Sequence, residues 1–111
     1  MVKAGALKRR YVLFRLEGQR MDEEALKRAI YAEALKFFGE YGLSKAALKL
    51  MNYDEKKKLG ILRCERSHQD IVLGFLALIG SLSGTPARLV TLKSSGTVKS
   101  LESTFLSSQD K

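Results

Sequence analysis

This sequence contains few of the residues from which small enzymes and metalloproteins build their sites. Its 111 residues include one cysteine, one histidine, one proline and no tryptophan. A lone Cys64 can form neither an internal disulfide nor a thiolate cage for a metal, and we expect it to be a small apolar group within a strand. A lone His68 likewise excludes a histidine cluster. The sequence therefore predicts no metal site.

The motifs of common catalytic sites are also absent. There is no GxxxxGK[ST] phosphate loop, no GxGxxG dinucleotide motif and no GxSxG nucleophile turn. The closest acidic residues, Asp22, Glu23 and Glu24, fall at a predicted helix start, where they are typical of dipole compensation rather than acid–base catalysis. We predict that the chain alone has no catalytic site and binds no cofactor.

No hydrophobic run is long enough to suggest a membrane span. The most apolar window, residues 71–82, is too short to cross a bilayer and contains glycine and serine. The first residues, MVKAGALKRRY, lack the apolar stretch of a secretory signal. These absences predict a soluble, cytoplasmic protein.

Positive charge is the property that the sequence has in excess. Twenty Lys and Arg against 12 Asp and Glu give a net charge of +8. This balance favours polyanionic partners, nucleic acid first and an anionic membrane surface second, although a merely solvated basic surface has the same composition. The length fits one domain, predicted over residues 11–106 between a basic arm at 1–10 and a short tail at 107–111.

Hydrophobic periodicity predicts four strands and three helices. We expect strands at residues 11–17, 46–52, 59–66 and 87–94, and helices at 22–38, 69–82 and 98–106. Asp22 and Ser67 are the expected N-caps of the first two helices. The order of elements predicts an α+β, ferredoxin-like βαββαβ fold with an added C-terminal helix. That last helix, through Val98, Leu101 and Phe105, is expected to cover part of the open sheet face.

The two main helices carry more apolar side chains than one sheet face needs. The expected core stripes are Leu26, Ile30, Ala34, Phe37 and Tyr41 in the first helix, and Ile71, Phe75, Leu78 and Leu82 in the second. A further set is predicted to contact another protein, namely Tyr31, Leu35, Phe38, Leu73 and Leu76. A wide core face in which the helices wrap each other explains the same pattern equally well.

Groups suited to phosphate binding occur at three places. A basic stretch precedes the first strand, arginines mark the passage from the third strand to the second helix, and a hydroxyl-rich turn with one glycine follows the fourth strand. The candidate RNA-binding residues are Lys8, Arg9, Arg10, Arg63, Arg66, His68, Lys93, Ser95, Gly96, Thr97 and Lys99. The topology alone does not decide whether they form one patch. The lysines of the 54–58 hairpin are expected to be a solvated tip.

Base stacking is disfavoured as the mode of RNA binding. RNA-recognition motifs stack bases on aromatic residues of the third strand, and the matching stretch here, residues 60–64, has none. Recognition of phosphates and of RNA shape remains.

Four segments resemble a known family. RRYVLF, FFGEYG, NYDEKKKLGILRCER and SSGTVKSLESTFL, in this order, are similar to the small archaeal ribonuclease P subunits called protein component two, which are related to a eukaryotic subunit of ribonucleases P and MRP. The likeness extends from Arg10 to about Leu106. It implies an RNA-recognition-like fold and RNA contact at the matching positions, which are Arg63, Arg66, Ser95, Gly96, Thr97 and Lys99.

The resemblance also implies a function. Such a subunit belongs to an endoribonuclease that removes the 5′ leader of precursor tRNA, in which the RNA supplies the active site and holds the metal ions. The implied partners are ribonuclease P RNA, precursor tRNA, a barrel-shaped component three in a heterotetramer, and other ribonuclease P proteins. An alternative from the fold alone is a ferredoxin-like regulatory module that binds small molecules. An acyl-phosphate hydrolase is disfavoured, because Gly18 and Arg20 make a poor phosphate loop.

Overall fold

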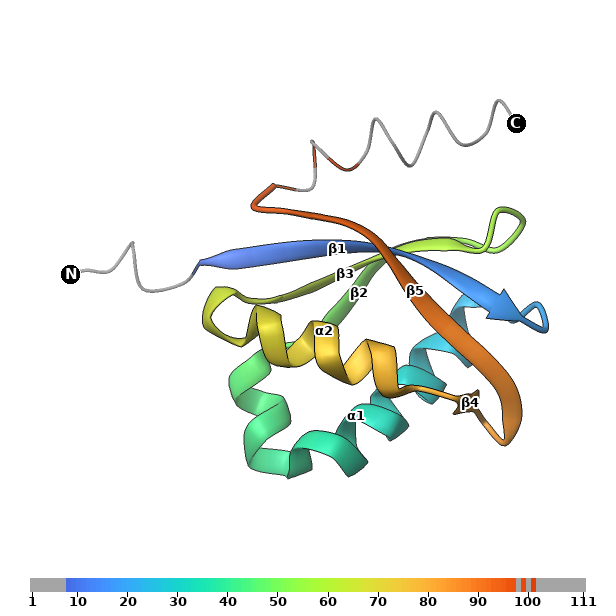
Figure 1. The fold of residues 1–111 in the computed structure, drawn as a ribbon, viewed down its shortest axis with the longest axis horizontal. Helices are drawn as coiled ribbons and strands as arrows, with labels where there is room; N and C mark the ends of the chain where they lie inside the picture. The colour runs from blue at the N-terminus through green and yellow to red at the C-terminus, as the bar shows by residue number, and fades with distance from the viewer. Residues whose placement is uncertain (1–7, 98, 100, 102–111) are drawn as a thin grey trace.

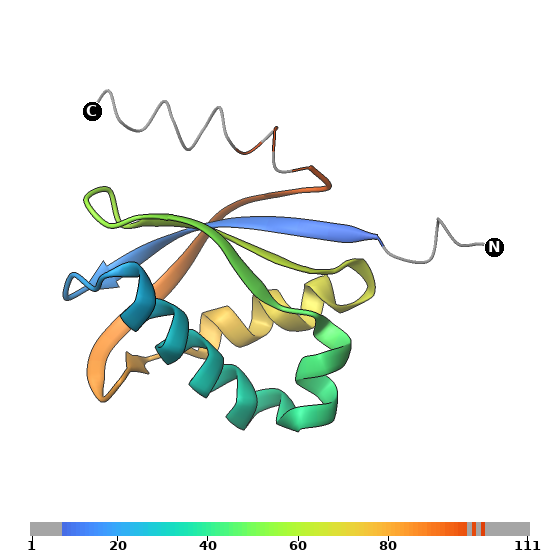
Figure 2. The ribbon, with the colours of Figure 1, turned by 180° about the vertical axis from the view of Figure 1, so that it is seen from behind.

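A curled antiparallel sheet carries two helices on one face. The computed structural model describes residues 8–97, 99 and 101. In chain order the elements are β1 (Arg9–Gly18), α1 (Glu23–Ala46), β2 (Lys49–Asp54), β3 (Leu59–Glu65), the 3-10 turn η2 (Arg66–His68), α2 (Gln69–Leu78), β4 (Ser81–Leu82) and β5 (Thr85–Ser95). The strand order is β2-β3-β1-β5-β4, and both helices lie on the same side (Figure 1 and Figure 2). The predicted α+β, ferredoxin-like arrangement is confirmed, with the short β4 as an unpredicted addition.

The central strand is β1, which pairs with β3 on one side and with β5 on the other. Its side chains alternate between the two faces. Val12, Phe14 and Leu16 are buried on the helix-bearing face, where they pack with residues of α1, α2 and β3 in the main core. None of the helices in the described ranges combines the length and the hydrophobicity needed to cross a membrane.

The opposite face of the sheet has a smaller apolar cluster. Leu13 and Ile61 are buried there beneath Leu101, with Tyr11 and Met51 packed at the margin. Leu101 thus covers the open face as predicted from the sequence. Val98, Phe105 and the rest of the predicted terminal helix lie outside the described residues, except for Lys99 and Leu101, which are helical.

The first helix begins as predicted but ends later. The Asp22 carboxylate accepts a hydrogen bond from Ala25 N–H at 2.7 Å, which confirms the N-cap. At Gly39 the helix bends, with a φ of 75° that glycine adopts without strain, and it then continues to Ala46. Because the bend changes the helical phase, Tyr41 leaves the predicted core stripe and is 77% exposed. Phe37, which precedes the bend, is 45% exposed and packs against the Phe75 ring.

The second helix differs from the prediction at both ends. Ser67 does not cap it. Instead, the Ser67 N–H and hydroxyl both donate to the Glu65 carboxylate, which starts the turn η2. The helix ends at Leu78, because the chain must reach β4 and reverse through Ser83 and Gly84, both at positive φ.

The buried stripe of α2 also differs from the prediction. Val72, Phe75, Leu76 and Ile79 enter the core, and their spacing is a regular helical pattern. Ile71 and Leu78, which were predicted to be core residues, point to solvent instead, and Leu78 is 73% exposed.

Gly60 supports the Phe14 ring and provides a test of the core. Gly60 pairs with Phe14, and an added Cβ would overlap that ring and lie 3.1 Å from the Asn52 carbonyl oxygen. We therefore expect Gly60→Ala to destabilise the fold by about 1–3 kcal/mol, measured by urea unfolding. The matched control is Gly74→Ala in α2, where an added Cβ meets nothing within 4 Å, and which should stabilise the helix by about 0.5–1 kcal/mol. Equal stability of Gly60→Ala and the parent protein would contradict the packing.

Candidate nucleic-acid interface

The strand register brings two predicted phosphate-binding segments together. At one end of the sheet, Tyr11 of β1 pairs with Arg63 of β3 on one side and with Ser95 of β5 on the other. Leu13 likewise pairs with Lys93. The ends of β3 and β5 therefore flank the start of β1. Whether these segments adjoin was left open by the sequence, and the strand order places them next to one another.

Arg9 and Arg10 belong to β1, so the first strand begins two residues before its predicted start at residue 11. Arg9 pairs with Glu65, and Arg10 pairs with Cys64. The pairing continues one residue further, since the Arg66 N–H donates to the Lys8 carbonyl oxygen at 2.8 Å. The first strand extends beyond its apolar residues because the backbone of β3 continues to pair with it as far as Glu65.

Arg10 is oriented by a hydrogen-bonded relay. Its Nε donates to Gln69 Oε1 at 2.6 Å, and Gln69 Nε2 donates to Ser94 Oγ at 3.3 Å. A Cβ at Gly96 would lie only 3.2 Å from Arg10 Nη1, so the glycine leaves room for the guanidinium. The relay joins β1, α2 and β5, and it fixes one cation where the three elements meet.

Positive charge dominates this end of the molecule. The segments 8–13, 63–70 and 93–97 together with residue 99 hold seven Lys and Arg against two carboxylates, Glu65 and Asp70. Ion pairs among the described residues engage Arg15, Arg20, Lys36, Lys57 and His68, and none of the seven cations at this end. We call the group formed by Lys8, Arg9, Arg10, Arg66, Lys93 and Lys99 the basic end.

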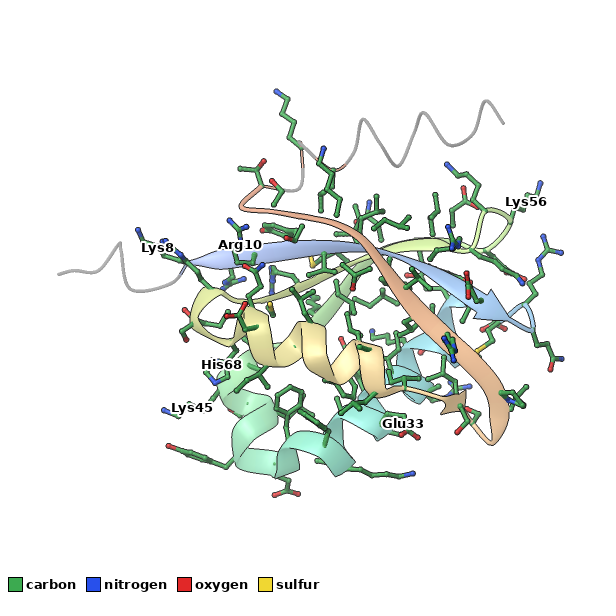
Figure 3. The ribbon with its side chains drawn as sticks, viewed as in Figure 1. Lys8, Arg10, Glu33, Lys45, Lys56 and His68 are labelled. Carbon is green, nitrogen blue, oxygen red and sulfur yellow. The ribbon has the colours of Figure 1, made fainter. Side chains whose placement is uncertain are left out.

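The hairpin lysines lie elsewhere. Figure 3 shows Lys8 and Arg10 at one end of the sheet and Lys56 at the other. Lys57 pairs with Asp54 at 3.6 Å, and Lys58 donates to the Gly18 carbonyl oxygen. The hairpin is therefore separate from the basic end.

The turn after β5 is stabilised from within. The Thr97 N–H donates to Ser95 Oγ at 3.2 Å, so this amide is engaged in the turn rather than presented to a phosphate. Gly96 is exposed, and its lack of a side chain leaves space for the Arg10 guanidinium. Lys99 is exposed one turn further along the chain.

His68 belongs to a local network around Glu65. Its Nδ1 lies 3.1 Å from Ser67 Oγ and 3.9 Å from a Glu65 oxygen. The hydrogen bonds from the Ser67 hydroxyl and backbone N–H, together with the nearby His68, hold the pKa of the Glu65 carboxyl below its usual value. The network shapes the passage from β3 to α2, next to the basic end.

Arg63 is placed differently from the other candidate cations. Its Nε is buried and has no hydrogen-bond partner among the described residues. The side chain lines a groove between α1 and β2. Arg63 thus lies beside the basic end but contributes to another surface.

The predicted protein-contact residues fall into three environments. Leu76 is 1% exposed and belongs to the core, so it is not available to a partner. Phe38 and Leu73 are partly buried against that core, with the Phe38 ring centroid 5.5 Å from that of Phe75. Tyr31 and Leu35 line the groove that contains Arg63, and Leu35 is 45% exposed.

The sequence did not predict the exposure of four of the five large apolar side chains that are exposed on the described helices, namely Phe37, Tyr41, Ile71 and Leu78, and predicted only that of Leu35. All four had been assigned to core stripes. For α2 a signal was present, because Val72, Phe75, Leu76 and Ile79 follow the i, i+3, i+4, i+7 spacing. For α1 the one relevant signal was Gly39, and it was weak, because many glycines occur in helices without bending them.

The described residues offer no group suited to covalent or metal chemistry at this end. Burial, with a contribution from the Glu65 charge, raises the pKa of the Cys64 thiol to about 11, so it is no nucleophile near neutral pH. No cluster of three or more His, Cys, Asp and Glu in the described ranges could hold a metal ion. The arrangement can bind anions.

Comparison with known proteins extends the likeness seen in the sequence. A model of the Rpp14/Pop5 family matches residues 10–106. Ribonuclease P protein component 2 of Pyrococcus furiosus is 36% identical over 101 residues, 90% of this chain and 84% of the relative. The protein of that name from Methanocaldococcus jannaschii is 34% identical over 100 residues, 89% and 73% of the two chains.

A solved structure shares the fold. A chain in the cryo-EM structure of yeast ribonuclease MRP superposes with a TM-score of 0.68 at 13% identity, covering 97% of each chain. At this identity the likeness concerns the fold alone. These comparisons give no support to the alternative of a regulatory module that binds small molecules.

The Glu65 network predicts a pH dependence of stability. Because the folded-state pKa of Glu65 is lowered, its contribution is complete above the pKa of about 4.3 expected in the unfolded chain and is lost as the pH falls through the folded-state value. We expect Glu65→Gln to lower the melting temperature near neutral pH and the difference from the parent to shrink on acidification. Glu24→Gln, remote from the network, controls for loss of one charge. A difference that grew towards low pH would refute the assignment.

Proposed function

We propose an RNA-binding role from one premise: the chain belongs to the Rpp14/Pop5 family and is a protein subunit of ribonuclease P. In this role the basic end binds phosphates of a folded RNA and helps the RNA to remove the 5′ leader of precursor tRNA. The subunit neutralises phosphates between closely packed RNA segments and so favours the cleavage-competent fold. The chemistry of cleavage belongs to the RNA.

The observation that carries this proposal is the gathering of cations at one end of the sheet without carboxylate partners. Six Lys and Arg side chains make up the basic end, and they come from β1, from β5, from residues flanking these two strands and from the turn η2 after β3. None of them is neutralised by an ion pair among the described residues. Cations left unpaired in this way favour a polyanion, whose bound counterions are released on binding.

The open sheet face supports phosphate and shape recognition over base stacking. Leu101 covers Leu13 and Ile61 there, and Tyr11, the aromatic residue of the same cluster, packs beside them. A base could not stack across this surface without displacing Leu101.

The partners proposed for the chain follow from the same role. They are ribonuclease P RNA, precursor tRNA, a barrel-shaped component three within a heterotetramer, and other ribonuclease P proteins. Exposed apolar residues on the helices, Phe37, Ile71 and Leu78, support the protein contacts. We propose no cofactor for the chain itself, with the metal ions of the reaction held by RNA.

Reconstitution tests the function directly. Cleavage of precursor tRNA is measured with the ribonuclease P RNA and its other proteins, with and without this chain, at fixed Mg²⁺. We expect the chain to increase the rate and to lower the Mg²⁺ concentration needed, because its cations replace part of the screening that folded RNA requires. Cleavage that is indifferent to the chain at every Mg²⁺ concentration would reject the function.

Substitutions at the basic end test the site. The triple variant Arg9→Ala, Arg66→Ala, Lys93→Ala should bind ribonuclease P RNA at least ten-fold more weakly, with its log–log salt slope reduced by about 0.7–0.9 per lost phosphate contact. The control with equal loss of charge is Arg15→Ala, Arg20→Ala, Lys56→Ala, and it should keep most of the affinity. Thermal unfolding should be similar for both. Equal weakening of the two variants would indicate that net charge alone drives binding.

A further inference from the structure

A groove lies along the edge of the sheet between α1 and β2. Its volume is about 600 Å³, and its floor is formed by Leu35, Leu43, Ala47 and Leu48. It occurs where the last turns of α1 lead into the edge strand, a region seen in Figure 2. Leu35 is 45% exposed and Leu43 and Leu48 are only partly buried, so the floor is accessible apolar surface.

Three cations rim this groove. Lys27 comes from α1, Lys49 from β2 and Arg63 from β3. Lys49 and Arg63 are partners in the β2–β3 register, so two like charges face each other across neighbouring strands. No carboxylate is among the described lining residues, and none of the three cations has an ion pair among the described residues.

The buried Nε of Arg63 adds an unsatisfied donor. It has no hydrogen-bond partner in the described part of the chain, a costly condition for a buried polar atom. A carboxylate bound at the rim would supply a counter-charge for both the Arg63 guanidinium and Lys49. The groove thus combines accessible apolar surface with three cations that lack a negative counter-charge among the described residues.

We propose that this groove binds a segment of a partner protein in which apolar and acidic side chains are interspersed. The apolar side chains pack on the leucine floor, and carboxylates reach Lys27, Lys49 and Arg63. The inference goes beyond the RNA-binding role and does not depend on it, since the basic end consists of other residues.

The floor of the groove favours a peptide over RNA. Its apolar residues are aliphatic except for Tyr31, and bases stack on aromatic rings rather than on leucines. The Tyr31 hydroxyl accepts the Leu50 N–H at 3.1 Å, so this edge amide is already used and is not available for strand addition. Recognition by side chains, rather than by backbone pairing, is therefore the mode proposed.

The test uses the full chain labelled with ¹⁵N and three synthetic hexapeptides, with amide shifts as the readout. The probe alternates leucine and glutamate, one control replaces glutamate by lysine, and the other replaces leucine by serine. We expect the probe to shift amides of residues 27–35, 43–49 and 63, with at least ten-fold weaker effects from both controls. No saturable shift there at millimolar probe, or an equal response to the lysine control, would overturn the proposal.

Variants separate the groove from nonspecific charge. Lys27→Glu should weaken binding of the leucine–glutamate peptide at least ten-fold, whereas Lys36→Glu, an exposed change on α1 outside the groove, should leave it unchanged. Arg63→Met, which keeps most of the aliphatic stem, should weaken it as well. A decameric uridine RNA that displaced the peptide from the groove would refute a protein ligand. If the triple variant at the basic end bound ribonuclease P RNA as tightly as the parent protein, the RNA site would be refuted. The peptide-binding result for the groove would not be affected.

Discussion

The pairing of β1 with both β3 and β5 is the constraint on which the structure depends. Because strands flank β1 on both sides, its backbone groups are satisfied along the sheet and its side chains are buried on both faces, Val12 and Phe14 under the helices and Leu13 under Leu101. The same pairing continues to Arg9, beyond the apolar part of the strand. The arginines at the start of β1 are therefore fixed by the sheet, and little backbone entropy remains to be lost when they bind.

Features set by neighbouring residues were predictable from the sequence. The Asp22 cap depends on amides three residues away, and the hairpin at 54–58 depends on local charge and turn chemistry. The cover of the open face by Leu101 followed from apolar spacing combined with topology. The cap and the hairpin each depend on a local interaction without a close competitor, so the sequence pattern predicts one structure. The Leu101 contact is long-range and was predictable because the topology left one sheet face open.

Features decided by tertiary contacts were not predictable in the same way. The bend at Gly39 redirects Tyr41 to solvent, although the apolar period continues through it. Glu65 competes with the backbone for Ser67 and removes the predicted cap. The predicted start of the first strand was wrong because a polar arginine joins a strand when a neighbouring strand supplies hydrogen-bond partners for its backbone. Hydrophobic periodicity carries no information about those partners.

The placement of Arg63 shows how one strand can serve two surfaces. Arg63 pairs with Tyr11 on one side and with Lys49 on the other, so it sits at the boundary between the basic end and the groove. Four of the six cations of the basic end, Lys8, Arg66, Lys93 and Lys99, are exposed, and the basic end acts on a polyanion through summed charge, which salt screens. The Arg63 guanidinium has a buried Nε without an acceptor and lines a mainly apolar groove, where one carboxylate can supply its counter-charge. The two surfaces thus differ in the number and the surroundings of their cations, and residues adjacent in the sheet are suited to different partners.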